Sequence, residues 1–188
     1  MNTENFWVAI SALATLVYTT VTAINLVFVS RQITDSRRFM QAQFINELQR
    51  EFHQFSKVFE QLEQPEQLKY LDNNHLEMRN AFIECFNFFE RIKTLLDTNV
   101  INLHLINRVF AYQFFLLVNT PQVQDKILFE RGNHFWEIFA LHKQLIDFRN
   151  SRGQFIPLAK TDLARRNPSF YQANLKHYHQ NIKRNSGA

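Results

Sequence analysis

The sequence is poor in the residues that build turns and crosslinks. Among 188 residues there are three glycines, four prolines and one cysteine. An all-β chain needs many tight turns made with glycine and proline, so this composition favours an all-α fold. The single Cys85 excludes a disulfide within the chain and a structural zinc site built on cysteines. Its apolar neighbourhood predicts a small buried side chain rather than a nucleophile.

Charge is absent from one long stretch near the N-terminus. Residues 6–30 are 25 positions without Asp, Glu, Lys or Arg. As a helix they would extend about 37 Å, more than the roughly 30 Å hydrocarbon core of a bilayer. A cleaved signal peptide needs a basic start and a shorter apolar stretch, whereas residues 1–5 carry Glu4 and no Lys or Arg. A buried soluble helix is the alternative, but such helices rarely run this far without a charge. Residues 6–30 therefore predict a transmembrane helix.

Basic residues follow this stretch and do not precede it. Residues 1–30 contain no Lys or Arg, whereas Arg31, Arg37 and Arg38 come directly after the span. The positive-inside rule places these three arginines at the cytoplasmic membrane interface. We therefore expect a single-pass protein of the cell inner membrane, in contact with membrane lipid. Residues 1–5 would be an extracytoplasmic stub, and the C-terminal part would lie in the cytoplasm.

Small polar residues form one stripe along the predicted span. They recur three or four positions apart: Ser11, Thr15, Thr19, Thr22 and Asn25. Such residues favour close contact between helices in lipid, which predicts a possible oligomer interface with a second copy or with another membrane protein. The alternative is that each threonine bonds to its own helix backbone. Asn25 favours contact, because its amide cannot be fully satisfied locally.

The remaining sequence predicts helices throughout. Residues 31–64 contain no glycine or proline, so the membrane helix is expected to continue as a juxtamembrane helix. Its apolar positions follow a heptad-like pattern: Ile45, Leu48, Phe52, Phe55, Phe59 and Leu62. Under three heptads with three phenylalanines favour docking onto the chain's own bundle over a coiled coil.

Apolar periodicity and cap residues divide the rest of the chain. Residues 65–153 are expected to form a cytoplasmic helical bundle, in which one helix ends near Asp97 and another runs from about residue 102 to 118. Cap residues are expected at 72–74, 120, 133 and 167. Residues 154–188 form a basic C-terminal segment whose apolar residues, Phe155 and Leu158 among them, are expected to pack, with a last helix from Pro168 to about Lys183. The predicted fold is all-α: one N-terminal transmembrane helix continues into a long cytoplasmic helix that packs on a small helical bundle.

Common catalytic and ligand-binding patterns are absent from the sequence. There is no glycine-rich phosphate loop, GxSxG, HExxH or Glu-x-x-His pair. His177 and His179 form the one close histidine pair, but on a helix their rings point apart. We expect the seven histidines to be solvated, and we predict no catalytic residue, cofactor or metal ligand.

Asn87 and Glu90 lie three residues apart among aromatic residues and form a possible polar core or functional pair. Polar groups in such surroundings need partners. With His104 nearby, Glu90 could act as a general base or a metal ligand. The favoured alternative is an ion pair of Glu90 with Arg108 or Arg131, with Asn87 capping or crosslinking helices. It is favoured because no second carboxylate accompanies Glu90 in the sequence pattern.

The C-terminal segment is basic and interleaved with aromatic residues. Its possible contacts with an anionic surface are Lys160, Arg165, Arg166, Lys176, Lys183 and Arg184. A solvated face is the default interpretation, and contact with anionic lipid is the next. Nucleic acid is a disfavoured partner because the chain is tethered, and the sequence indicates no particular small molecule.

The order of these parts resembles a bacterial family of single-span proteins labelled domain of unknown function 4760. The likeness covers roughly residues 7–150. It is carried by Arg31-Gln32, the stretch from Gln43-Phe44 to Phe59, Asn87-Phe88-Phe89-Glu90-Arg91-Ile92, Val100-Ile101 and the segment around Phe110. The family has no assigned activity, so the resemblance implies a topology and no reaction.

Taken together, the sequence predicts a bitopic inner-membrane protein with a noncatalytic cytoplasmic module for interaction or sensing. A membrane-tethered effector of a stress or defence response is one form of this prediction. The alternatives are a membrane-anchored enzyme that uses Glu90 and a histidine, and a tethered nucleic-acid-binding protein that uses the basic segment.

Overall fold

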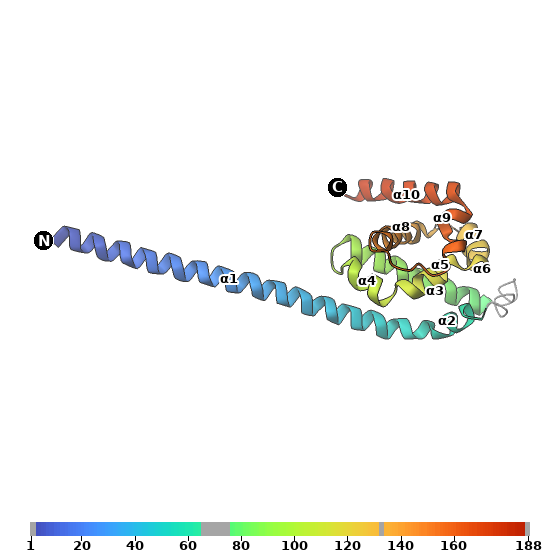
Figure 1. Ribbon diagram of the computed structural model, residues 1–188, viewed down its shortest axis with the longest axis horizontal. Coiled ribbons are helices and arrows are strands. Elements are labelled where there is room, and N and C mark those ends of the chain that lie inside the picture. Colours follow the sequence, from blue (N-terminus) through green and yellow to red (C-terminus); the bar gives the residue numbers. More distant parts are fainter. Residues whose placement is uncertain (1–2, 65–75, 132–133, 187–188) are drawn as a thin grey trace. The chain divides into compact units, whose positions relative to one another are not determined.

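The computed structural model describes residues 3–64, 76–131 and 134–186 (Figure 1). Every regular element in these ranges is a helix, so the all-α class is confirmed. The chain divides into two compact units, Met1–Asn46 and Glu47–Ala188. Each is described by itself below.

One long helix, α1, covers Thr3–Phe52 and continues past the end of the apolar stretch, as expected. The juxtamembrane helix expected to reach residue 64 is interrupted, however. A 3-10 turn at His53–Phe55 (η1) separates α1 from α2, Ser56–Leu62. At this turn the Phe52 ring contacts the rings of both Phe55 and Phe59, 6.0 and 5.0 Å away, so aromatic packing accompanies the break.

The second unit is a bundle of helices of unequal length. The two longest between α2 and the C-terminal segment are α3, Leu76–Asp97, and α8, Trp136–Asn150. Short elements lie between them: α4 Leu103–Val109, α5 Ala111–Asn119, α6 Pro121–Val123, the π-helix η3 Gln124–Leu128 and α7 Phe129–Arg131. The C-terminal segment adds the 3-10 turn η5 Ala159–Thr161, α9 Leu163–Arg166 and α10 Pro168–Ser186. α8 packs against both α3 and α10.

Several predicted helix ends are confirmed. The side chain of Asn102 accepts a hydrogen bond from the Leu105 amide at 2.9 Å, and Asn167 accepts one from the Phe170 amide at 3.2 Å. The helix expected over 102–118 is divided at Phe110, and α9 was not predicted. Thr120 precedes α6 as expected, but its hydroxyl donates to the Leu116 carbonyl instead of capping. The caps predicted at residues 72–74 and 133 lie outside the described residues.

Phenylalanine fills the core of the bundle. The Phe52 ring lies 5.3 Å from the ring of Phe88 and 5.3 Å from that of Phe110, while the rings of Phe89 and Phe114 pack edge to face at 5.0 Å. The seam residues Leu48, Phe55, Phe59 and Leu62 are buried, so this part of the heptad-like seam docks on the chain's own bundle as favoured. Cys85 is fully buried, as predicted, and burial raises the pKa of its thiol.

Candidate functional sites

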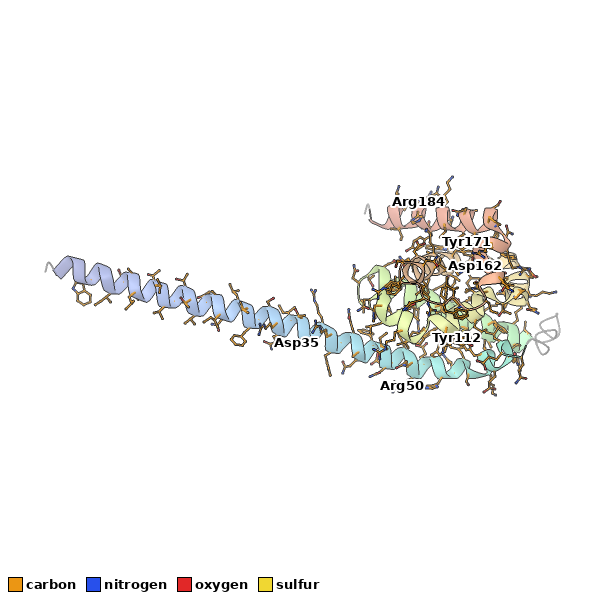
Figure 2. The ribbon with its side chains drawn as sticks, in the orientation of Figure 1. Asp35, Arg50, Tyr112, Asp162, Tyr171 and Arg184 are labelled. Atoms are coloured by element: carbon orange, nitrogen blue, oxygen red, sulfur yellow. The ribbon has the colours of Figure 1, made fainter. Side chains whose placement is uncertain are left out.

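The N-terminal helix presents apolar side chains to its surroundings (Figure 2). Twelve large hydrophobic residues between Trp7 and Val29 are exposed, and none of the residues in the most apolar window is buried. In the described residues α1 is the one helix both long and apolar enough to cross a membrane. The length, composition and exposure of α1 are therefore consistent with a membrane span.

The threonines of the predicted polar stripe form hydrogen bonds with the backbone of α1. Thr15 donates its hydroxyl to the Ser11 carbonyl at 2.8 Å, Thr19 donates to the Thr15 carbonyl, and Thr22 donates to the Tyr18 carbonyl at 2.8 Å. The threonines therefore follow the local alternative, in which each satisfies its own helix backbone. Asn25 is exposed on the same helix. Among the predicted interface residues, Asn25 is therefore the one whose side chain most needs a hydrogen-bond partner from another helix.

The three arginines that follow the apolar stretch are exposed. Arg38 lies 4.0 Å from Asp35, and both side chains are more than three-quarters exposed, so this pair contributes little to stability. Exposed arginines of this kind can reach toward lipid headgroups.

A polar cluster joins α3, α8 and α10. Its members are Glu90, Lys93, Thr94, Asp97, Glu137 and Tyr178. At its centre Lys93 is fully buried, and its ammonium donates to Asp97 and to the Tyr178 hydroxyl. Tyr178 in turn donates to Asp97 Oδ2 at 2.6 Å. Thr94 lies at the edge and donates to Glu137 Oε2 at 3.2 Å. Burial lowers the pKa of Lys93, although Asp97 and Glu137 oppose this shift.

The surroundings of Glu90 correct the sequence interpretation. Burial, and then the negative charge of Glu137, raise the pKa of Glu90 to about 8. Burial also raises the pKa of Glu137. Glu90 forms no ion pair with Arg108 or Arg131 in the described part of the chain, so the expected arginine pairing is wrong. Glu137, 47 residues further along the chain, is the second carboxylate that the local sequence pattern did not reveal.

Asn87 and His104 do not complete a site with Glu90. Asn87 is exposed, because the buried face of α3 is formed by residues such as Cys85, Phe86, Phe88 and Phe89 on either side of it. The polar-core interpretation of Asn87 is therefore wrong. His104 is also exposed, and its ring lies 6.3 Å from that of Phe148.

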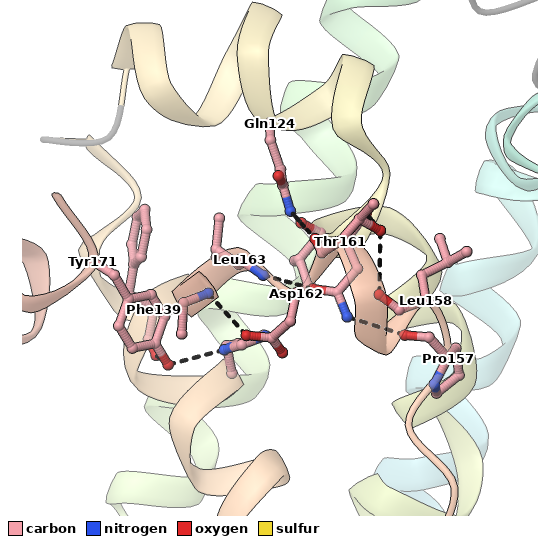
Figure 3. A network of polar contacts seen from close by, with 12 residues as sticks. Gln124, Phe139, Pro157, Leu158, Thr161, Asp162, Leu163 and Tyr171 are labelled. Carbon is pink, nitrogen blue, oxygen red and sulfur yellow. Dashed lines mark hydrogen bonds and ion pairs between the residues drawn. The ribbon is translucent and has the colours of Figure 1, made fainter. Parts of the chain in front are cut away.

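A second polar network, missed by the sequence analysis, includes Asp162 and Tyr171 (Figure 3). Between these two side chains lies His142. His142 is fully buried on α8, so the expectation that the histidines are solvated is wrong for this residue. Its Nδ1 lies 2.9 Å from the Tyr171 hydroxyl, and its Nε2 lies 3.4 Å from Asp162 Oδ2. Burial alone would raise the pKa of Asp162, but the adjacent His142 and the backbone amides hold it below its usual range.

The sequence carried a signal for this network. His142 lies three and four positions from Phe139 and Ile138, and three before Leu145, all of which are buried. Helical periodicity therefore places the histidine on the inward face of α8. Asp162 is also the N-cap of α9, where its Oδ1 accepts from the Ala164 amide at 3.0 Å.

A pocket of about 290 Å³ adjoins this network. Asp162 and Tyr171 form its buried side, and charged or amide side chains of Lys143, Asp147, Arg165 and Gln172 form its rim. Lys143 and Asp147 are paired with each other at 2.8 Å. Both ring nitrogens of His142 face Tyr171 and Asp162, so the imidazole is held between two side chains and does not face a substrate directly.

Buried amides hold the segment before α10 against α5 and η3. Asn119 donates to the Pro157 carbonyl at 3.0 Å and accepts from the Leu163 amide at 3.1 Å. Gln124 donates to the Thr161 carbonyl at 2.9 Å, as Figure 3 shows. These bonds fix both ends of the stretch from Pro157 to Leu163.

The predicted basic surface loses one member. Arg166 donates to Gln124 Oε1 at 2.8 Å, to Asp125 at 3.1 Å and to the Pro121 carbonyl at 3.1 Å. It therefore links α9 to α6 and η3, so its guanidinium is engaged within the bundle although the residue is exposed. The remaining predicted residues are also exposed: Lys160, Arg165, Lys176, Lys183 and Arg184.

No known family, curated protein or solved structure matches this chain. The resemblance to domain of unknown function 4760 therefore stays a prediction.

Proposed function

We propose that the protein is a single-span protein of the cell inner membrane, with its N-terminus outside and its helical bundle in the cytoplasm. The bundle acts as a noncatalytic module for interaction or sensing, for instance in a membrane-tethered stress or defence effector. Membrane lipid is the first partner, and a second copy is the next.

The observation that carries this proposal is the exposed apolar surface of α1. Leaving twelve large hydrophobic side chains in water would cost on the order of 20 kcal/mol relative to burying them. That exceeds the usual net stability of a folded domain. Embedding residues 6–30 in lipid removes this cost, and the hydroxyl-to-carbonyl bonds of Thr15, Thr19 and Thr22 leave those groups satisfied there.

The orientation rests on the exposed basic residues at one end of the apolar stretch. Arg31, Arg37 and Arg38 follow it, and residues 1–30 contain no Lys or Arg. Anionic headgroups and the positive-inside rule favour the cytoplasmic side for such arginines.

The polar clusters of the bundle support a binding or sensing role over the enzyme alternative. Glu90 lies near Glu137, whose charge raises its pKa, while His142 is held by Tyr171 and Asp162. The nucleic-acid alternative is weakened because Arg166, one of its six basic residues, serves contacts within the bundle.

Paired arginine substitutions in α1 test the membrane assignment. Val17→Arg with Val21→Arg places two charges inside the proposed span, at a cost of about 5 to 7 kcal/mol of insertion free energy. Ile33→Arg with Phe39→Arg is the matched control, because these residues are similarly exposed on α1 but lie beyond Ser30.

We expect the wild type and the control to stay with carbonate-washed membranes, and the Val17/Val21 variant to be lost from them. A C-terminal reporter active only in the cytoplasm gives the orientation. A wild-type chain that is soluble without detergent, or a C-terminus cut by protease from the periplasmic side of intact cells, would refute the proposal.

A further inference from the structure

The segment between α8 and η5 exposes hydrophobic residues in a bundle that buries most of its aromatic side chains. Phe155 is 76% exposed and Leu158 is 42% exposed. The sequence pattern suggested that these residues pack, so their exposure is a correction. We call residues 152–160 the apolar loop.

Backbone and side-chain bonds on both sides of the exposed residues hold the apolar loop in place. The Gln154 amide donates to the Arg149 carbonyl at 2.9 Å, and Asn107 donates to the Gln154 side chain at 3.1 Å. The Leu158 carbonyl accepts from the Thr161 amide at 3.0 Å. Leu158 has a φ of 52°, a left-handed conformation that costs free energy for a residue other than glycine. The exposure of Phe155 and Leu158 is thus built into an anchored loop.

The charge of the loop is uniformly positive. Between Asp147 and Asp162 the sequence contains Arg149, Arg152 and Lys160 and no acidic residue. Arg152 and Lys160 are exposed, as is Arg165 just beyond the loop. Exposed aromatic and aliphatic side chains flanked by cations match the two layers of an anionic membrane surface, which are acyl chains and negatively charged headgroups.

We propose that the apolar loop docks the bundle onto the anionic inner leaflet, with Phe155 and Leu158 entering the acyl boundary and Arg152 and Lys160 contacting headgroups. This inference rests on the proposed function, because the proposed span tethers the bundle to that membrane. A tether raises the effective concentration of the loop at the bilayer, so a contact too weak to recruit a soluble protein is populated here.

The test uses the full-length protein in lipid nanodiscs with a fluorescent label beside the loop. Ala159→Cys supplies an exposed thiol and leaves Phe155 and Leu158 in place, while the native Cys85 is buried and should remain unlabelled. Tyr112→Cys provides the matched control, an exposed position on α5 away from the loop in the sequence. Bromine-substituted lipids report whether each label reaches the acyl chains.

We expect quenching of the label at residue 159 to be at least about twofold stronger in discs with phosphatidylglycerol than in phosphatidylcholine discs. Adding Phe155→Ser and Leu158→Ser should abolish this quenching, and adding Arg152→Gln and Lys160→Gln should remove its dependence on anionic lipid. The label at residue 112 should be quenched weakly in every disc.

Equal quenching at residues 159 and 112 would overturn the inference, as would quenching at 159 that the serine substitutions leave unchanged. Capture of the loop by another protein in cells without quenching in purified discs would also overturn it, in favour of a protein partner. Failure of the proposed function is distinct, because the chain would then not assemble into discs at all.

Discussion

Among single residues, the buried titratable groups show which charges the bundle pairs and which carboxyl it keeps protonated. Lys93 is paired with Asp97 and bonded to Tyr178, whereas burial and the negative charge of Glu137 both raise the pKa of Glu90. A carboxyl in that position is stabilised by keeping its proton. Folding should therefore take up a proton near neutral pH.

This predicts a pH dependence of stability centred on Glu90. Its pKa is about 8 in the folded protein and about 4.5 as a free side chain, so the folded state holds more protons between these values. The free energy of unfolding should consequently fall as pH rises from about 4.5 to 8. Glu90→Gln keeps a neutral side chain, so it should stabilise the bundle at pH 8 by roughly 2 kcal/mol and flatten this dependence.

Thermal unfolding followed by circular dichroism in detergent, from pH 5 to 8.5, would measure this effect. Glu84→Gln on the exposed face of α3 is the control and should leave the pH dependence as in the wild type. A Glu90→Gln variant whose stability still falls with pH as steeply as the wild type would assign the effect to another group.

Arg166 supports a second prediction at this scale. Its guanidinium bonds to Gln124, Asp125 and Pro121, so Arg166→Ala should destabilise the bundle by about 1 to 3 kcal/mol. Lys176→Ala removes an exposed charge on α10 and should change stability by less than about 0.5 kcal/mol. Urea denaturation of both variants checks the difference; equal effects would return Arg166 to the basic surface.

Among the helices, α1 shows that similar polar residues can differ in how their side chains are hydrogen-bonded. The hydroxyl of Thr19 donates to the carbonyl one turn earlier, whereas an asparagine amide in lipid is best satisfied by another helix. Asn25→Val should therefore weaken self-association of the full-length protein about three- to tenfold, and Thr19→Val should change it little. Energy transfer between labelled copies in vesicles measures both. A larger loss with Thr19→Val would favour the whole stripe as the interface.

Periodicity and cap residues correctly predicted those helix ends that depend on local interactions. Helix α3 ends at Asp97 and α10 begins at Pro168 as predicted, because breaking and capping residues act within one turn. The break of α1 at His53–Phe55 was missed, since nothing local forces it and its phenylalanines are contacted from α3 and Phe110. Both polar clusters were missed for the same reason: Glu137 and Asp162 reach their partners only through tertiary packing.

At the scale of the whole molecule, the two units differ in what they would do alone. The second unit has its own core, which includes residues contributed by the end of α1, by η1 and by α2: Leu48, Phe55, Val58, Phe59 and Leu62. A fragment that begins at Glu47 should therefore be soluble without detergent and unfold cooperatively. Chain length alone would suggest the same for a fragment that begins at residue 65.

The shorter fragment should fail, because removing these five buried apolar side chains costs about 1.5 to 3 kcal/mol each, which is comparable to the whole stability of a domain. It would also uncover Phe88 and Phe110, whose rings contact Phe52. Thermal unfolding and dye binding to exposed apolar surface compare the two fragments. If residues 65–188 unfolded as cooperatively as residues 47–188, then the buried residues of α1 and α2 would pack on the bundle without being needed for its folding. If they bind dye and lose cooperativity, the helix that begins in the proposed span ends inside the core of the bundle that it tethers.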